Sequence, residues 1–296
     1  MPKPIPYKFR LAYFFAFILA FMVGFPILVF YSAGYSFDNT LGNTFGFSIR
    51  GGIYVFTPEP NTSIFVGNEL KSVSGFFNKE VLISKLKPDQ YLVLAANENF
   101  WPWAKLVEVK RGEVEPLFPL LVPKVIQTEE IKKTDSSYEE VLDLFAVNEL
   151  LTKPTNISKT TIVANGATST VESITRRDVK IWLEGNTVYG QWIGDEDEAP
   201  KYFCVLDILK DDETNCTDQI LVFNSFVPIK SFDFYPQRDD AIILALENGI
   251  FAIEIDRRTY QNFYPMYRGE LPDFRVDRSQ IYVKDEGQFF SLDIQP

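Results

Sequence analysis

The feature that most constrains this chain is an apolar run close to its N-terminus. Between Leu11 and Tyr31 the sequence LAYFFAFILAFMVGFPILVFY holds 21 residues without a charge. A helix needs roughly 20 apolar residues to cross the hydrocarbon core of a bilayer. The apolar part of a cleaved signal peptide is shorter, at about 7–15 residues. We therefore predict an uncleaved transmembrane signal anchor within residues 1–35, with cleavage near Ser32–Gly34 as the alternative.

The charges around this run predict its orientation. Lys3, Lys8 and Arg10 precede it, and Asp38 is the first charged residue after it. Basic residues collect on the cytoplasmic side of membrane helices. We therefore expect a single-pass protein with its N-terminus in the cytoplasm and its C-terminal body outside.

The composition favours a β-rich body and excludes several chemistries. The chain has 27 Phe and 14 Tyr, which suit pleated surfaces, and turn residues throughout. It has no histidine, which excludes Ser-His-Asp and Cys-His catalysis and His-ligated zinc. The net charge of −11 disfavours nucleic acid as a partner.

The pattern after the anchor predicts a tether and a small antiparallel β-sandwich. Residues 36–49 are rich in Asn, Gly, Ser and Thr and are interpreted as the tether. Residues 50–123 hold about six short runs of alternating apolar and polar residues, separated by turns that contain Gly, Pro, Asn or Asp. So many short strands in so few residues are typical of a sandwich.

The spacing of these turns resembles that of the PEGA domain. The resemblance covers residues 50–123 and implies the same sandwich fold. The matching segments are Gly52–Val55, Thr57–Pro60, Ile64–Leu70, Leu86–Tyr91, Glu98–Phe100 and Gly112.

Within this segment, NENFWPWAKLVEVKRGE carries the candidate binding residues Phe100, Trp101 and Trp103. Trp101 and Trp103 have the same parity, so a strand would direct both side chains to one face. Two interpretations stay open: rings that cap a small core or pack on the next domain, or an exposed aromatic platform for a sugar or peptide. The alternation through Trp103, Lys105, Val107 and Val109 is not expected to place every large side chain inside.

Residues 124–159 are interpreted as a charged linker followed by a helix. Ser136–Glu140 offers a capping box, an apolar stripe continues to Leu151, and Pro154 ends it.

Residues 160–296 predict a propeller-like antiparallel β domain. Three segments each contain a strand, a turn with Gly and another strand: Val179–Ile193, Ala241–Asp256 and Gln280–Ile294. Three such hairpins are fewer than the ~4–8 blades of a propeller, so a sandwich of similar hairpins is the alternative. Phe232–Val276 also resembles the tail of PEGA domain-containing, membrane-anchored proteins of candidate-phyla (Parcubacteria-like) bacteria. That resemblance implies the bacterial cell membrane as the location.

The two cysteines predict a disulfide. Cys204 and Cys216 are the only cysteines, and a pair outside the cytoplasm is expected to be oxidised. The acidic runs Gly194–Pro200 and Lys210–Asn215 lack the spacing of a calcium loop and are interpreted as solvated turns. We expect no metal and no cofactor.

These features favour a non-enzymatic binding or scaffolding protein of the cell envelope. Its partner would be an envelope protein or a wall glycan. The first alternative is a structural subunit of an envelope or pilus-like assembly, as a homo- or hetero-oligomer. The second is a surface glycoside hydrolase, which needs two carboxyl groups across a cleft. With 40 acidic residues, the sequence does not single out such a pair.

Overall fold

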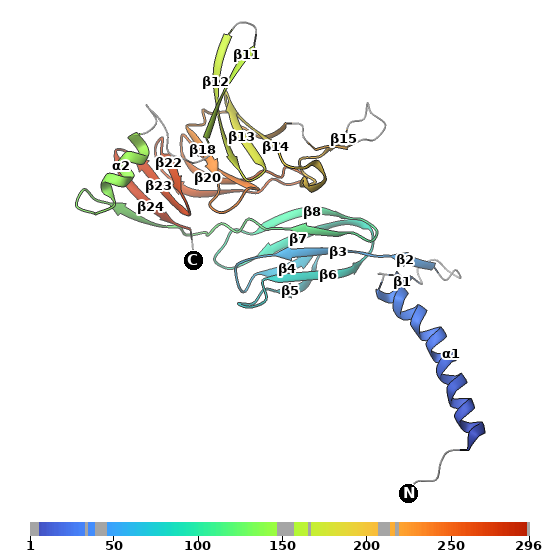
Figure 1. Cartoon of the computed structure of the whole chain (residues 1–296). Helices are drawn as coiled ribbons and strands as arrows, with labels where there is room; N and C mark the ends of the chain where they lie inside the picture. Colours follow the sequence, from blue (N-terminus) through green and yellow to red (C-terminus); the bar gives the residue numbers. More distant parts are fainter. Residues whose placement is uncertain are drawn as a thin grey trace. The chain divides into compact units, whose positions relative to one another are not determined.

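The chain is mainly β, with one apolar N-terminal helix and several antiparallel sheets (Figure 1). The computed structural model describes residues 6–32, 35–38, 46–146, 157–164, 167–206, 214–216 and 219–294. These residues belong to two compact units. Unit one comprises Met1–Val93 and Val107–Pro119, and unit two comprises Leu94–Leu106 and Leu120–Pro296.

The N-terminal apolar run is a continuous helix, α1 (Tyr7–Ser32), drawn in dark blue in Figure 1. Its stretch Phe9–Phe30 has a mean hydropathy of 2.4 and no buried part, and it is long and apolar enough to cross a membrane. Pro26 lies inside the helix without ending it. The prediction of an apolar helix of membrane length is confirmed. Its orientation and its retention in the mature protein stay predictions.

Unit one is built from short strands in two main sheets. A three-stranded sheet has the order β6-β3-β9, and a four-stranded sheet has the order β5-β4-β7-β8. The strands are β3 (Gly51–Phe56), β4 (Ser63–Val66), β5 (Glu69–Val73), β6 (Glu80–Leu86), β7 (Asp89–Ala96), β8 (Trp103–Val109) and β9 (Val114–Leu117). The C-terminal end of β7 and the start of β8 belong to unit two. A hairpin, β1 (Tyr35–Asp38) and β2 (Gly46–Ile49), precedes them within the predicted tether.

One pairing in unit one differs from the expected antiparallel arrangement. β9 pairs with β3 in parallel, with Gly52 opposite Val114. The strand before it, β8, lies in the four-stranded sheet. The turn at Gly112 (φ +73°) therefore connects two different sheets, and β9 need not run antiparallel to its new neighbour.

The core of unit one follows the alternation of its strands. Ile53, Val55, Ile64, Val66 and Val93 are 0–4% exposed, and residues at the other parity point outward. β3, β4 and β7 therefore each have one covered face, whereas β5 contains no buried residue.

Unit two contains three larger antiparallel sheets and one small one. Their orders are β11-β12-β13-β14-β17, β18-β19-β20-β21, β10-β24-β23-β22 and β15-β16. The strands are β10 (Gln127–Ile131), β11 (Ile157–Ala164), β12 (Ala167–Arg176), β13 (Val179–Glu184), β14 (Thr187–Trp192), β15 (Val205–Leu206), β16 (Thr214–Asn215), β17 (Ile220–Asn224), β18 (Ser231–Phe234), β19 (Ala241–Leu246), β20 (Gly249–Glu254), β21 (Phe263–Arg268), β22 (Asp273–Asp277), β23 (Gln280–Asp285) and β24 (Gln288–Asp293).

All three predicted hairpins form. They are the pairs β13–β14, β19–β20 and β23–β24, and each lies in a different sheet. The described residues show no closed ring of these sheets. A buried cluster that includes Ile181, Val222, Phe234 and Leu244 connects the first sheet with the second.

Part of the predicted charged linker is a strand. β10 pairs with β24, with Gln127 opposite Asp293. This pairing satisfies backbone groups that an isolated linker would leave to water. The following helix, α2 (Tyr138–Ala146), buries Val141 against Ile131 and Phe289. The predicted continuation of this helix to Pro154 lies outside the described residues.

The predicted disulfide is present between Cys204 and Cys216, which are 12 residues apart. The acidic run Gly194–Pro200 contains one short 3₁₀ turn, η1 (Glu196–Glu198). Most of the second run, Lys210–Asn215, lies outside the described residues.

Candidate functional site

The three candidate aromatic residues have different environments. Phe100 and Trp103 are 3% and 2% exposed, whereas Trp101 is half-buried. β8 begins only at Trp103. The backbone N–H of Trp101 donates to the carbonyl of Val122 at 2.9 Å, so the alternation of β8 does not extend to Trp101. Trp103 has no exposed ring face on which a sugar could stack, and the binding role of the three residues stays a prediction.

The expectation that β8 leaves a large side chain outside is wrong. Trp103, Lys105, Val107 and Val109 are all buried, at 2–6% exposed. A charged lysine is rarely buried unless it is paired. The polar partners of Lys105 therefore explain why its charged side chain is buried.

The Lys105 side chain makes its polar contacts within unit two. Its Nζ donates to the main-chain carbonyls of Asp256 at 2.9 Å and Tyr260 at 3.0 Å. Glu254 Oε2 lies 2.9 Å from the same Nζ. The Asp256 carboxylate is a further neighbour, with Oδ2 3.5 Å from Nζ. The three closer acceptors match the three protons of an ammonium group.

Glu254 collects three donors in a site that is closed to water. It is 5% exposed, and its carboxylate accepts from Trp103 Nε1, from Lys105 Nζ and, at 2.8 Å, from Asn262 Nδ2. Burial raises the pKa of Glu254 above its ordinary value, because it disfavours the charged form more than these donors favour it. Removing one partner of such a buried pair leaves an uncompensated charge.

Asn262 joins Glu254 to the main chain of β8. Its Nδ2 also donates to the Ala104 carbonyl at 3.1 Å, and the Ala104 N–H donates to its Oδ1 at 3.3 Å. The Tyr264 hydroxyl lies 2.8 Å from both Asn262 Oδ1 and the Pro102 carbonyl, which share its one proton. We call Trp103, Lys105, Glu254, Asn262 and Tyr264 the buried polar cluster.

Sequence reasoning missed the cluster, although two patterns pointed to it. Glu254 interrupts the apolar run GIFAIEI, and Lys105 interrupts WAKLVEV. A charged residue that breaks an apolar strand predicts a buried pair. The pairing itself joins residues far apart in the sequence, and no local pattern encodes it.

A second candidate site is the outer face of the sheet β6-β3-β9 in unit one. Alternation predicts polar residues on the solvated side of such a sheet. Three apolar residues lie there instead: Leu82, Val114 and Phe118 are 62%, 52% and 48% exposed. Tyr54 lies between Leu82 and Pro116 in the sheet register. We call this surface the apolar outer face; its members are Tyr54, Phe56, Leu82, Val114, Pro116 and Phe118.

The apolar outer face is contiguous. The Phe56 and Phe118 rings lie 6.5 Å apart, and the registered row formed by Leu82, Tyr54 and Pro116 is next to them. Glu80 is the charged neighbour, opposite Phe56. Contiguous exposed apolar surface of this kind marks interaction sites in proteins.

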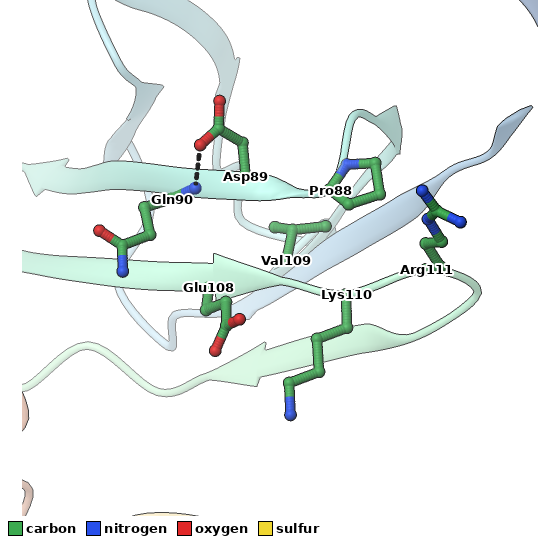
Figure 2. A pocket seen from close by; sticks show the side chains of 7 residues that line it. All are labelled: Pro88, Asp89, Gln90, Glu108, Val109, Lys110 and Arg111. Carbon is green, nitrogen blue, oxygen red and sulfur yellow. Dashed lines mark hydrogen bonds between the residues drawn. The ribbon is translucent and has the colours of Figure 1, made fainter.

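An open pocket in unit one lies at the start of β7 and the end of β8 (Figure 2). It is lined by Pro88, Asp89, Gln90, Glu108, Val109, Lys110 and Arg111. Figure 2 shows the carboxylates of Asp89 and Glu108 pointing in different directions. Asp89 accepts from the backbone N–H of Gln90 at 2.8 Å. This arrangement does not supply two carboxyl groups that face a common substrate atom.

Comparison with known protein families and curated sequences found no relative of this chain. No family model matches the chain, and no curated sequence matches it.

Proposed function

We propose that this is a non-enzymatic, membrane-anchored binding or scaffolding protein of the bacterial cell envelope. The observation that carries the proposal is the apolar outer face, exposed in a chain that also has a helix of membrane length. Such a face gains free energy when a partner covers it, at about 25 cal/mol for each Å² of apolar surface removed from water. The buried surfaces of the chain need no such partner.

Two features support a location outside the cytoplasm. The Cys204–Cys216 disulfide is typical of oxidising compartments. Lys8 and Arg10 flank the N-terminal end of the apolar run, as expected for its cytoplasmic end.

Two features of the strands support the fold families that we propose from the sequence resemblances. In unit one, Gly67 (φ +62°) and Gly112 (φ +73°) adopt the left-handed conformation at turns that the sequence resemblance to the PEGA domain includes. Unit two repeats a hairpin in three sheets, as a propeller-like domain with few blades would. We propose both as the fold family of their segments.

We infer that the partner of the apolar outer face is an envelope protein rather than a wall glycan. A glycan is recognised through many hydrogen bonds to its hydroxyl groups, and this face offers mainly carbon. Its composition is closer to the apolar centre of a protein–protein interface, where charged residues are depleted.

A structural subunit of a larger assembly is the second candidate. β5 and β6 are edge strands of their respective sheets. An edge strand offers unpaired backbone groups to a strand of another chain. This mode of association uses the backbone, so it survives changes to the side chains of the apolar outer face.

The test places a photo-crosslinking side chain at Leu82 in the full-length, membrane-inserted protein. A matched control places it at Leu271 in unit two, which is almost equally exposed at 61% against 62%. We expect one discrete crosslinked species from position 82 and none from position 271. The added substitution Phe118→Lys should abolish that species by placing a charge in the contact.

Three outcomes would contradict the proposal. Equal crosslinking at both positions would show non-specific contact. A product that contains only a second copy of the chain would favour the structural subunit. A product unchanged by Phe118→Lys would exclude the apolar outer face as the contact.

A further inference from the structure

We propose that Lys105 and Asn262 become joined by an isopeptide bond, which the folded protein forms by itself with Glu254 transferring the protons. This covalent crosslink goes beyond the binding role proposed above and does not depend on it. The buried polar cluster carries the proposal through three features: convergence on one oxygen, polarisation of a carbonyl group, and exclusion of water.

The nucleophile and the leaving group meet at one carboxylate oxygen. Glu254 Oε2 lies 2.9 Å from Lys105 Nζ and 2.8 Å from Asn262 Nδ2. A proton taken from the amine can therefore be delivered to the departing nitrogen by the same oxygen. General acid–base catalysis requires such hydrogen-bond distances to both atoms.

The carbonyl oxygen of Asn262 lies near two donor groups, one of which, the Tyr264 hydroxyl, shares its proton with the Pro102 carbonyl. The Tyr264 hydroxyl lies 2.8 Å from Oδ1, and the Ala104 N–H donates to Oδ1 at 3.3 Å. Attack on the amide carbon places negative charge on this oxygen. Donors that already point at it stabilise that charge without reorganisation.

The environment excludes water from the reacting groups. Lys105, Glu254, Asn262 and Tyr264 are 3–9% exposed, and Trp103 donates to the other oxygen of Glu254. Burial raises the pKa of Glu254, so its carboxyl group is suited to carry a proton during the reaction. After the transfer, the two remaining N–H groups of Lys105 still hold it on the carbonyls of Asp256 and Tyr260.

The reaction balances without an oxidant or a co-reactant. Lys105 gives one proton to Glu254, and the neutral Nζ forms a bond to Cγ of Asn262 while the C=O electron pair moves to Oδ1. The adduct collapses, the Cγ–Nδ2 bond breaks, and Nδ2 leaves as ammonia with the proton that Nζ releases. The products are one secondary amide, one ammonia and the protonated Glu254.

The bond would shorten the covalent path between the N-terminal anchor and the C-terminus. Tension between the two ends would pass directly from residue 105 to residue 262, and the residues between them would not extend. A chain held at a membrane by one end gains mechanical resistance from such a bond without any change in its exposed surface.

The experiment is the intact mass of the purified full-length protein in detergent, after reduction of the disulfide. We expect a mass lower by one ammonia than the sequence requires. Tandem mass spectrometry of a digest should give a branched peptide that joins Lys105 to Asn262.

Four variants make the result specific. Glu254→Gln should keep the full mass, because it removes the proton carrier and retains the shape. Lys105→Arg should also keep the full mass, which separates the crosslink from ring closure of Asn262 alone, since that also releases ammonia. Asn262→Asp, which loses water on linkage, should reach the same final mass as the linked native chain. Lys71→Arg, at an exposed ion pair in unit one, should leave the crosslink unchanged.

The proposal is overturned if the native chain has the full sequence mass, which would make the cluster a non-covalent ion pair. It is equally overturned if the ammonia loss persists in Lys105→Arg. Circular dichroism of Lys105→Arg and Glu254→Gln identifies a variant that has failed to fold, and the mass of the native chain then decides alone.

Discussion

The three-stranded sheet β6-β3-β9 of unit one and the four-stranded sheet β18-β19-β20-β21 of unit two differ in how they are covered. β3 alternates, with Ile53 and Val55 buried and Tyr54 and Phe56 partly exposed. β19 is buried at every position from Ala241 to Leu246. The first sheet therefore has a free apolar face, whereas in the second sheet the central strand β19 is buried on both faces. An apolar residue stabilises the fold of unit two, whereas on the free face of unit one it is available to a partner.

Tryptophan emission reports the unfolding of unit two and not that of unit one. The four tryptophans are Trp101, Trp103, Trp182 and Trp192, and all belong to unit two. Their emission therefore follows the unfolding of unit two. Hydrogen exchange of β3 and β6 follows unit one.

The largest effect is expected from the buried polar cluster. Lys105→Met removes the amine that pairs with Glu254 and, with it, the proposed crosslink, and removing one partner of such a buried pair costs about 3–5 kcal/mol of unfolding free energy. Urea unfolding monitored by tryptophan emission measures this loss in unit two. The matched variant Lys71→Met removes an exposed ion pair with Glu69 and should cost less than about 1 kcal/mol. Equal losses in the two variants would contradict the structural importance of the cluster.

The next effect separates the two sheets directly. Ile243→Ala in β19 removes a fully buried side chain and should lower the unfolding free energy by about 2–5 kcal/mol. Leu82→Ala in β6 removes a side chain that is 62% exposed and should change it by no more than about 0.5 kcal/mol. Hydrogen exchange of the amides in each sheet measures the change in unfolding free energy for each variant. A large loss from Leu82→Ala would show that another part of the fold already covers the apolar outer face.

A smaller effect is expected from reduction of the disulfide. Cys204–Cys216 closes a short loop in unit two, and its loss should cost about 2–3 kcal/mol by increasing the entropy of the unfolded chain. The emission midpoint in urea should fall after reduction, while exchange in β3 and β6 stays the same. A matched fall in both units would indicate that they unfold together.

The last effect is a dependence on pH in the sheet β18-β19-β20-β21. Burial raises the pKa of Asp233 on β18 to about 6 from 3.8, although Arg176, Arg275 and the Phe234 N–H oppose the shift. Between pH 4 and pH 6, roughly, the folded protein therefore holds a proton on Asp233 that the unfolded chain has lost. The contribution of Asp233 to the stability of unit two consequently falls as pH rises from about 4 to about 6. Asp233→Asn should remove that part of the slope. An unchanged slope in urea midpoints across this range would exclude Asp233 as its source.

Much of the fold was predictable because its signals are local. The apolar run from Leu11 to Tyr31, the alternation in β3 and the turn in each of the three hairpins involve neighbouring residues. The disulfide also followed from the presence of two cysteines only. The strand β10 was missed, because a charged segment becomes a strand only when β24 offers it an edge.

The candidate sites were less accessible to the sequence. The pattern marked Trp101 and Trp103 as a pair, but Trp103 is buried and Trp101 precedes the strand. The apolar outer face combines residues of three strands, and the parallel pairing of β3 with β9 was not expected.

By itself the sequence determined that the chain has a membrane-length apolar helix, a β-rich body, no imidazole chemistry and one disulfide. These properties depend on composition and on periods of a few residues. Tertiary structure decided which apolar surface is left exposed, and it brought Lys105, Glu254 and Asn262 to one point. Burial and long-range pairing depend on which distant strands become neighbours, and the sequence of one strand does not specify its partner strand.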